Sequence, residues 1–434
     1  MMMGTTVLLL LLLAGSSVFV AAVLGLLGGT LSGAFSTFPL IRGLGEVAWS
    51  SSADFVLVAV PMFILMGELL LRSGVTDSMF TALDRWVGHV PGGLMHTNIA
   101  SSAVFAATSG SSIATAATIG TVSIPNMEKY GYRPSIFLGT IAAGGTLGIL
   151  VPPSINMVLY GAMSETAVSD LYLAALIPGL ALALLFSLYV YAACKINKSL
   201  APSGDRPAAS WGERFASLVH LGPPLFLFLL VVGSIYAGLA TATEASALGV
   251  VGALVLVMLR GRLSVEMLLR SFEGTVRTTA MVMVIVIAAY FLNFVLSTLG
   301  LTDRAVSWVG ELNWPPLGVL LAIIVLYVIL GCFVESLTLM VATTPIVVPI
   351  IANLGYSPVW FGVVFVILIE TALITPPIGM NLFVVQSVRK GGAFRDVVVG
   401  SLPFVGIMFL LIALLIAFPS LALWLPELFA STRA

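Results

Sequence analysis

Residues 105–160 read FAATSGSSIATAATIGTVSIPNMEKYGYRPSIFLGTIAAGGTLGILVPPSINMVLY. One apolar run stops at Thr108–Ser112 and resumes, and a second stops between Gly144 and Ser154, around Pro152-Pro153, and resumes. Because lipid cannot hydrogen-bond to free backbone groups, such interruptions persist at membrane depth only where they are buried in protein or line a cavity. Two of them close together are typical of the ion and substrate site of a secondary transporter.

The composition indicates a membrane protein. Of the 434 residues, 59% are hydrophobic and 9% are charged, whereas soluble proteins carry about 25% charged residues. A net charge of -1 gives no basic surface for nucleic acid. The two cysteines lie in apolar runs and the three histidines are scattered, so neither a disulfide framework nor a metal cluster is indicated. The sequence contains no nucleophile–base arrangement or nucleotide-binding loop, and we expect no enzyme activity.

Several apolar runs reach or approach the roughly 20 residues that a membrane span needs. They lie near residues 5–29, 53–71, 170–194, 221–238, 243–259, 277–299 and 397–419. The first lacks the positive flank of a signal peptide, so we interpret it as a retained helix. Residues 30–50 are predicted to be a half-span or an interfacial segment. Three amphipathic segments are predicted to lie along the interface, namely 76–87, 262–274 and 302–311.

The second half of the chain repeats the first. Pro125, Gly131, Tyr132, Pro134, Pro152 and Pro153 recur 224 positions later as Pro349, Gly355, Tyr356, Pro358, Pro376 and Pro377. Residues 70–195 and 296–420 are therefore interpreted as two copies of one unit. Lys and Arg in the linker 195–215 place it in the cytoplasm by the positive-inside rule. Five crossings separate the bases of the two copies, which predicts an inverted-topology repeat.

Each copy is predicted to hold a re-entrant hairpin followed by a broken helix. The first hairpin is 92–127, with its tip at Ser109–Ser112, and the first broken helix is 134–164. The second hairpin is 316–351, with its tip at 334–338, and the second broken helix is 358–388. The expected fold is thus an all-α polytopic membrane protein with inverted repeats, similar to the ion-transporter superfamily.

These units predict a division into two kinds of domain. The transport domain is expected to comprise 92–169 and 316–390. The scaffold is expected to comprise 1–75, 170–301 and the C-terminal helix 391–434, with interfacial arm helices at 76–91 and 302–315.

The helix breaks offer oxygen ligands to cations. Proline has no N–H, so Pro152 frees the Gly148 carbonyl and Pro376 frees the Ala372 carbonyl. One cation site is predicted between Ser109–Ser112 and the 145–152 segment, and another between 335–338 and 375–379, with an anionic substrate between them. The candidate substrate ligands are Ser154, Asn156 and Asn381. Each feature also has a structural explanation. The Ser109–Ser112 run could serve helix packing through small residues, and the Pro-Pro pairs could only kink their helices. Glu335 could be a neutral acid that bonds to nearby backbone, and Glu370 could have a structural role.

Together the motifs resemble the large membrane subunit of the tripartite ATP-independent periplasmic (TRAP) transporters, the C4-dicarboxylate permease (DctM) type. The resemblance covers nearly the whole chain. It is carried by Pro61–Glu68, Gly92–Leu94, Ser109–Ser112, Gly131-Tyr132, Gly148–Ser154, Tyr236–Ala245, Pro345–Pro349 and Thr375–Gly379. The chain departs from the family at Ala242, where the family has proline at the start of a scaffold helix.

The resemblance implies a sodium-driven importer of an organic acid, such as a C4-dicarboxylate, sialic acid or a sulfonate, in the bacterial inner membrane. It implies an elevator motion, Na⁺ as the coupling ion and no other cofactor. It implies two partners, a small four-helix membrane subunit (DctQ type) and a periplasmic substrate-binding protein (DctP type). The family's sodium ligands correspond to Ser109, Gly110, Ser111, Ser112, Gly145, Gly148 and Pro152 at one site, and to Glu335, Ser336, Thr338, Thr375, Pro376 and Gly379 at the other.

Other classes of function stay open from the residues alone. A stand-alone sodium/carboxylate symporter of the same architecture would need no soluble receptor. An intramembrane enzyme could use Glu335 or Glu370 as an acid or base, although the sequence shows no nucleophile–base pair or metal-ligand set to accompany either. A channel is disfavoured because no ring-forming filter motif is present.

Overall fold

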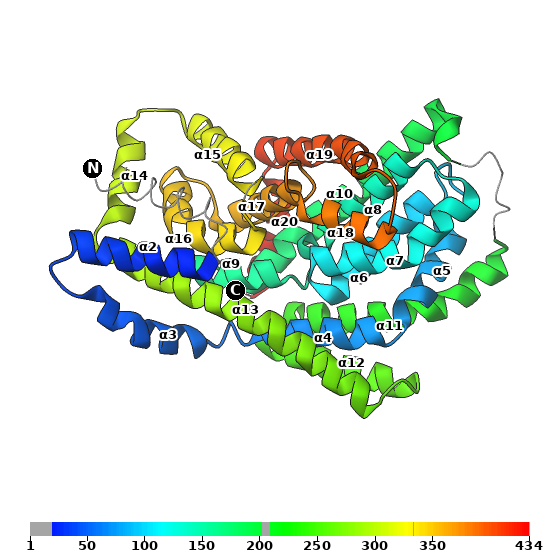
Figure 1. Ribbon diagram of the computed structural model, residues 1–434, viewed down its shortest axis with the longest axis horizontal. Coiled ribbons are helices and arrows are strands. Elements are labelled where there is room, and N and C mark those ends of the chain that lie inside the picture. Colours follow the sequence, from blue (N-terminus) through cyan, green and yellow to red (C-terminus); the bar gives the residue numbers. More distant parts are fainter. Residues whose placement is uncertain (1–19, 202–208, 333, 434) are drawn as a thin grey trace.

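The computed structural model describes residues 20–201, 209–332 and 334–433, and every regular element within them is a helix (Figure 1). Six helices are long and apolar enough to cross a membrane, or up to eight if each of two bent pairs forms one span. The expectation of a polytopic all-α protein is therefore confirmed. Residues 5–19 of the first predicted span, and residues 202–208 of the polar linker, lie outside the described residues.

The two repeats correspond helix for helix. The first contains α5 (Val75–Val87), α6 (Leu94–Ser109), α7 (Ser112–Tyr130), α8 (Pro134–Leu150), α9 (Ile155–Ser164) and α10 (Val168–Ile196). The second contains α14 (Leu301–Glu311), α15 (Pro316–Gly331), α16 (Ser336–Asn353), α17 (Pro358–Leu373), α18 (Met380–Arg389) and α19 (Phe394–Ala417). Helices α16 and α17 begin 224 residues after α7 and α8. The helix pairs α6–α7 and α15–α16 form the two hairpins, and α8–α9 and α17–α18 form the two broken helices.

The repeats run in opposite directions. The Tyr160 hydroxyl, near the end of α9, donates to the Pro358 carbonyl at the start of α17 at 2.7 Å. Asn381 of α18 lies against α8, with its Nδ2 3.5 Å from Ala142 O, so the two broken helices lie antiparallel. Helices α5 and α14, which open the two repeats, lie at opposite ends of the long axis in Figure 1. The inverted repeat inferred from loop charge is present in the structure.

Basic segments that the positive-inside rule predicts to be cytoplasmic gather at the base of the first hairpin. The Arg133 amide donates to Leu200 O at 3.3 Å, and Arg260 donates to the Ser78 hydroxyl at 3.2 Å. The loops after α10 and α12 (Ala242–Leu259) therefore lie on the same face as α5 and the end of α7, as the positive-inside rule requires.

Local sequence explains where each helix begins and ends. Proline occupies the first turn of α8, α15 and α17, where its missing N–H costs nothing. Ser111 caps α7 by accepting a hydrogen bond from the Ala114 amide. The breaks lie between α8 and α9, which are bent by 43°, and between α17 and α18. Each break contains a cis Pro-Pro bond.

The helices pack as two groups, which we call the outer layer and the inner body. The outer layer consists of α2 (Val20–Phe35), α3 (Leu44–Ser52), α4 (Ala59–Arg72), α11 (Trp211–Tyr236), α12 and α13 (Val265–Thr298). Within it, α2 packs on α13, and α12 packs on α4. The inner body consists of α6–α10 and α15–α19, and the outer layer runs below it in Figure 1.

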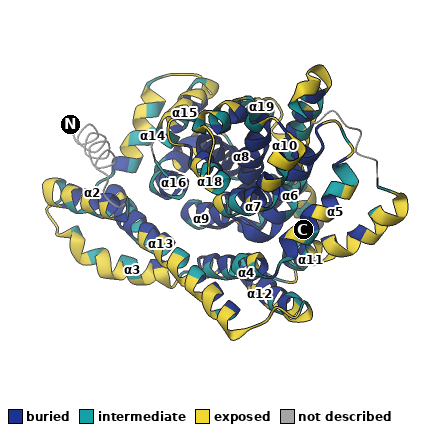
Figure 2. Ribbon diagram, turned by 45° about the vertical axis from the view of Figure 1, so that its right-hand side comes forward, coloured by how far each residue is buried: buried dark blue, intermediate teal, exposed yellow. Residues whose placement is uncertain are grey.

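Helices α10 and α19, which the sequence predicts to be part of the scaffold, pack on helices of the inner body. Helix α19 packs along α8 so closely that a Cβ on Gly400 would lie 1.8 Å from Ser135 O. Helix α10 packs on α6, α8 and α17. Both belong to the inner body, at whose centre α8 is buried (Figure 2). Helices that face lipid and helices that face other helices are equally apolar in sequence. Only the observed packing therefore shows which group a helix belongs to.

One of the predicted interfacial segments differs in the structure. Residues 262–274 do not form a separate interfacial helix, because α13 continues without a break from Val265 to Thr298. The mixed segment 30–50 forms the end of α2, a 3₁₀ turn η1 (Leu40–Gly43) and most of α3. A short turn η2 (Lys198–Leu200) follows α10, and a further helix, α20 (Ser420–Arg433), follows α19 and packs on α10.

Candidate functional site

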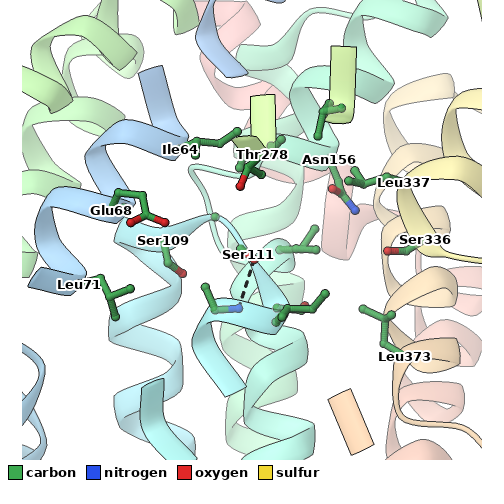
Figure 3. Close-up of a pocket in the computed structure, with 18 of the residues that line it drawn as sticks. Ile64, Glu68, Leu71, Ser109, Ser111, Asn156, Thr278, Ser336, Leu337 and Leu373 are labelled. Carbon is green, nitrogen blue, oxygen red and sulfur yellow. Dashed lines mark hydrogen bonds between the residues drawn. The ribbon is translucent and has the colours of Figure 1, made fainter. Parts of the chain in front are cut away.

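A cavity of about 170 Å³ lies where both hairpin tips meet the outer layer (Figure 3). The first hairpin contributes Ser109–Ser112 and the second contributes 335–337, while Asn156 comes from α9. Helices α4 and α13 close it with Glu68 and Thr278 among other residues. The cavity therefore adjoins both repeats and both packing groups.

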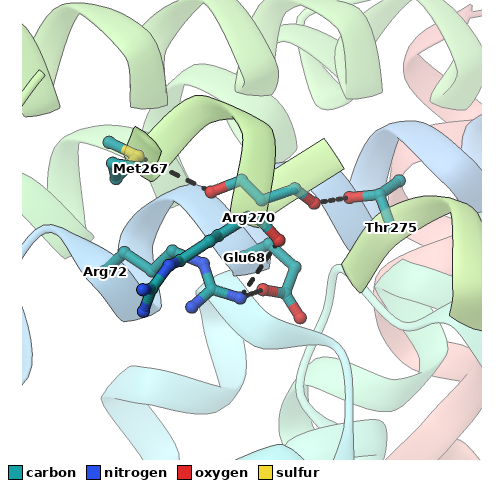
Figure 4. A network of polar contacts seen from close by, with 6 residues as sticks. Glu68, Arg72, Met267, Arg270 and Thr275 are labelled. Carbon is teal, nitrogen blue, oxygen red and sulfur yellow. Dashed lines mark hydrogen bonds and ion pairs between the residues drawn. The ribbon is translucent and has the colours of Figure 1, made fainter. Parts of the chain in front are cut away.

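The charged residues around this cavity are acidic. Glu68 and Glu335 line it, and none of its described lining residues is Lys, Arg or His. Glu68 forms an ion pair with Arg72 at 2.7 Å, and Arg72 also donates to Arg270 O at 3.3 Å, which ties α4 to α13 (Figure 4). An organic anion entering such a cavity meets the carboxylate of Glu335, which has no basic partner in the lining, unless cations accompany the anion.

The first predicted cation site is held together by its own hydroxyls. The Ser109 hydroxyl hydrogen-bonds to the Thr115 hydroxyl at 2.9 Å, and Thr115 Oγ1 donates to Ser111 O at 2.7 Å. Gly110 turns the chain at φ +59, a conformation that other residues rarely adopt. The tip thus presents a tight cluster of hard oxygen atoms of the kind that sodium prefers.

Glycines on α8 allow the tip to touch the broken helix. A Cβ on Gly148 would lie 2.6 Å from Ser111 O, and a Cβ on Gly145 would lie 2.8 Å from the Ala116 side chain. A Cβ on Gly110 would lie 3.1 Å from Pro153 O, in the break beside Pro152. The structure therefore brings the predicted residues of the first site together, and hydroxyl and carbonyl oxygens are the kind of ligand atom that a sodium ion takes.

The second set forms around the start of α16. Glu335 caps this helix by accepting from the Thr338 amide at 3.1 Å and from its hydroxyl at 3.3 Å, and the Ser336 hydroxyl donates to the same carboxylate at 3.1 Å. A second cavity of about 290 Å³ is lined by Glu335, Thr338 and Gly379. The hairpin tip and the second break therefore face the same space.

One detail of the second break differs from the prediction. The Ala372 carbonyl is not free, because the Thr375 amide donates to it at 3.2 Å. The chain tightens into i→i+3 bonds at the end of α17, which satisfies carbonyls that an ideal helix would leave open. The Thr375 hydroxyl donates to Thr371 O at 2.6 Å, and its lone pairs remain available as acceptors. Pro376 follows directly.

The candidate substrate ligands separate into two kinds. Asn156 lines the cavity between the hairpin tips, and its Nδ2 has no hydrogen-bond partner among the described residues. Ser154 is instead occupied as the N-cap of α9. Asn381 is fully buried, with Nδ2 3.5 Å from Ala142 O. Only Asn156 is placed to meet a ligand in that cavity.

Three polar residues near the site were not predicted as site residues. Thr115 bonds both Ser109 and Ser111, and its place one turn after Ser111 on the same helix face was a usable signal. Glu68 lines the cavity, and Glu370 accepts a hydrogen bond from the Ser112 hydroxyl. Both are acids within apolar runs, a pattern that marks functional positions in membrane proteins.

Comparison with known proteins identifies the family. Residues 5–421 match the family described as "Tripartite ATP-independent periplasmic transporter, DctM component". The chain belongs to the DctM family of TRAP transporters. Over 388 residues it is 34% identical to the C4-dicarboxylate TRAP transporter large permease protein DctM of Pseudomonas aeruginosa, covering 89% of this chain and 90% of that one. Over 378 residues it is 34% identical to the sialic acid TRAP transporter large permease protein SiaM of Vibrio cholerae, covering 87% of each.

The fold is also found in a solved structure. The YdaH transporter of Alcanivorax borkumensis, whose crystal structure is described as having an unusual topology, matches with a TM-score of 0.64 at 17% identity, covering 96% of this chain and 98% of that one. The DctM family consists of transporter permeases, and the predicted identity as a TRAP large permease is confirmed. This family and its apolar helices make the chain a multi-pass protein of the bacterial inner membrane.

Proposed function

We propose that this DctM-family permease imports a small organic acid together with sodium ions, using the cavity between its two hairpin tips. The support comes from the charge of that cavity. Glu335 lines it and forms no ion pair within the described part of the chain, whereas Glu68 is paired with Arg72, and no described lining residue is basic. A carboxylate is repelled there unless cations bind at the adjoining tips, and this dependence is the physical basis of coupling. Asn156 is the candidate to bind the acid by hydrogen bonding.

The proposed substrate is a small carboxylate. A cavity of about 170 Å³ is smaller than the roughly 300–1,000 Å³ of pockets for drug-sized ligands. Two relatives are named for the transport of C4-dicarboxylates and of sialic acid. Both kinds of compound contain a carboxylate group, which is consistent with this class.

We further propose that the inner body moves as an elevator against the outer layer. The cavity lies between the two groups, with Glu68 and Thr278 on one side and both hairpin tips on the other. A Cβ on Gly67 of α4 would lie 3.3 Å from Ser109 O, so the tip meets α4 at a position that has no side chain. In this proposal α10 and α19 move with the hairpins.

The proposed partners are a small four-helix membrane subunit and a periplasmic substrate-binding protein. In the alternative of a stand-alone symporter, neither would be required. Uptake into proteoliposomes separates the two. The permease is reconstituted with its small subunit, and uptake of a radiolabelled C4-dicarboxylate or sialic acid is measured with and without the cognate binding protein.

We expect uptake only when an inward sodium gradient and the binding protein are both present. Uptake without the binding protein would favour the stand-alone symporter. Uptake driven equally by potassium and sodium gradients, with the membrane potential clamped, would refute sodium coupling.

A further inference from the structure

Glu370 is a fully buried acid that the proposed sodium ligands do not account for. It lies in α17, one turn before the second helix break, and is 1% exposed. The Ser112 hydroxyl, from the tip of the first hairpin, donates to its Oε2. Its Oε1 is buried and has no hydrogen-bond partner among the described residues. An ionised carboxylate in this position is costly unless a cation offsets it.

The groups around this contact come from both repeats. A Cβ on Gly145 would lie 3.2 Å from Ser112 O and 3.0 Å from Asn381 Nδ2. Asn381 is fully buried, and its Oδ1 also has no partner among the described residues. Two buried oxygens of the second repeat, one on the acid that contacts Ser112 and one on the amide beside Gly145, therefore have no donor among the described residues, whereas buried polar atoms are normally satisfied.

The first cation site also lacks a charge of its own. Its predicted ligands are the hydroxyls and carbonyls of 109–112 and of 145–152, all neutral, whereas the second site contains the carboxylate of Glu335. A cation leaving water for a neutral, buried site gives up strong solvation, and an anion in contact offsets that loss. Glu370 is an acid that touches the first site, and no Lys or Arg of the described chain forms an ion pair with it.

We propose that Glu370 supplies the negative charge of the first sodium site, through its contact with Ser112, and thereby makes that site depend on both repeats. This inference rests on the proposed sodium coupling. Because Glu370 lies in the last turns of α17, which lead to Thr375, a cation held at the first tip also fixes the helix end that borders the second site. Filling the first site is therefore expected to favour filling the second.

The test compares the purified wild type with Glu370→Gln and, as a control, Glu244→Gln. Glutamine keeps the size of the side chain and an acceptor for the Ser112 hydroxyl, but it removes the charge. Glu244 is an acid at the start of α12 that bonds to Thr241, and glutamine preserves that cap. The thermal unfolding midpoint is measured against NaCl concentration at constant ionic strength, with choline chloride as the replacement salt, because a ligand that binds the folded state raises it.

We expect Glu370→Gln to need at least about tenfold more sodium for half of the shift, with a lower Hill coefficient, while Glu244→Gln follows the wild type. Equal sodium midpoints for Glu370→Gln and wild type would overturn the inference and make Glu370 a neutral hydrogen-bonding acid. A wild type that does not respond to sodium beyond choline would instead overturn the sodium coupling itself.

A second variant covers the case in which Glu370→Gln does not fold. Glu370→Asp keeps the charge but shortens its reach to Ser112 by one methylene, and we expect it to need several-fold more sodium than the wild type. A sodium midpoint of Glu370→Asp equal to that of the wild type would then overturn the inference.

Discussion

Gly148→Ala would test whether the first hairpin tip must touch the broken helix for cations to bind. The added Cβ would lie 2.6 Å from both Ser111 O and Thr115 Oγ1. Neither atom can easily yield, because Ser111 O already accepts the Thr115 amide at 3.0 Å and its hydroxyl at 2.7 Å. Overpacking of this kind costs about 1–3 kcal/mol. If the tip relieves this overpacking by moving away from α8, sodium binding must restore the contact and loses the same free energy. The apparent sodium affinity then falls by roughly 5- to 140-fold, since about 1.4 kcal/mol corresponds to a factor of ten.

The assay is the sodium titration of the unfolding midpoint, followed by sodium-driven uptake in proteoliposomes. Gly233→Ala is the matched control, because Gly233 lies within α11 and an added Cβ there has no atom within 4 Å. It should leave the sodium titration unchanged and slightly stabilise its helix. A folded Gly148→Ala protein with the sodium affinity of the wild type would refute the contact between tip and helix as the basis of the site.

Two further variants test helix contacts, and a third tests the second proposed sodium site. Gly400→Ala should destabilise the protein by about 3 kcal/mol or more, because the Cβ would lie 1.8 Å from a backbone oxygen of α8. Gly406→Ala in the same helix should not, because an added Cβ there has no atom within 4 Å. Equal thermal unfolding midpoints of the two variants would contradict the packing of α19 on α8. Tyr160→Phe leaves the Pro358 carbonyl without its hydrogen-bond donor and should lower the free energy of unfolding by about 1–3 kcal/mol. An unchanged thermal unfolding midpoint would argue against the contact between α9 and α17. Thr375→Ala should raise the sodium concentration for half-maximal uptake, and an unaltered sodium dependence would remove Thr375 from the second site.

The repeat and its helix breaks were predictable because their signals are local. Glycine at a turn of positive φ and proline at a helix start act on the chain within a few residues, so Gly110 and Pro134 mark the same boundaries in sequence and in structure. Their recurrence at one fixed spacing carried the prediction of two copies. The inversion followed from counting spans and positive charges, which also needs no knowledge of packing.

The sequence by itself therefore determined an all-helical membrane protein of two inverted units, each with a hairpin and a broken helix. Only the tertiary structure decided which helices join the hairpins, because lipid and protein neighbours are equally apolar and leave no contrast along α10 or α19. It also decided that Ser112 meets Glu370, 258 positions away in the chain. Such a pairing depends on how two separate helices are placed against each other, and no spacing within either helix encodes it.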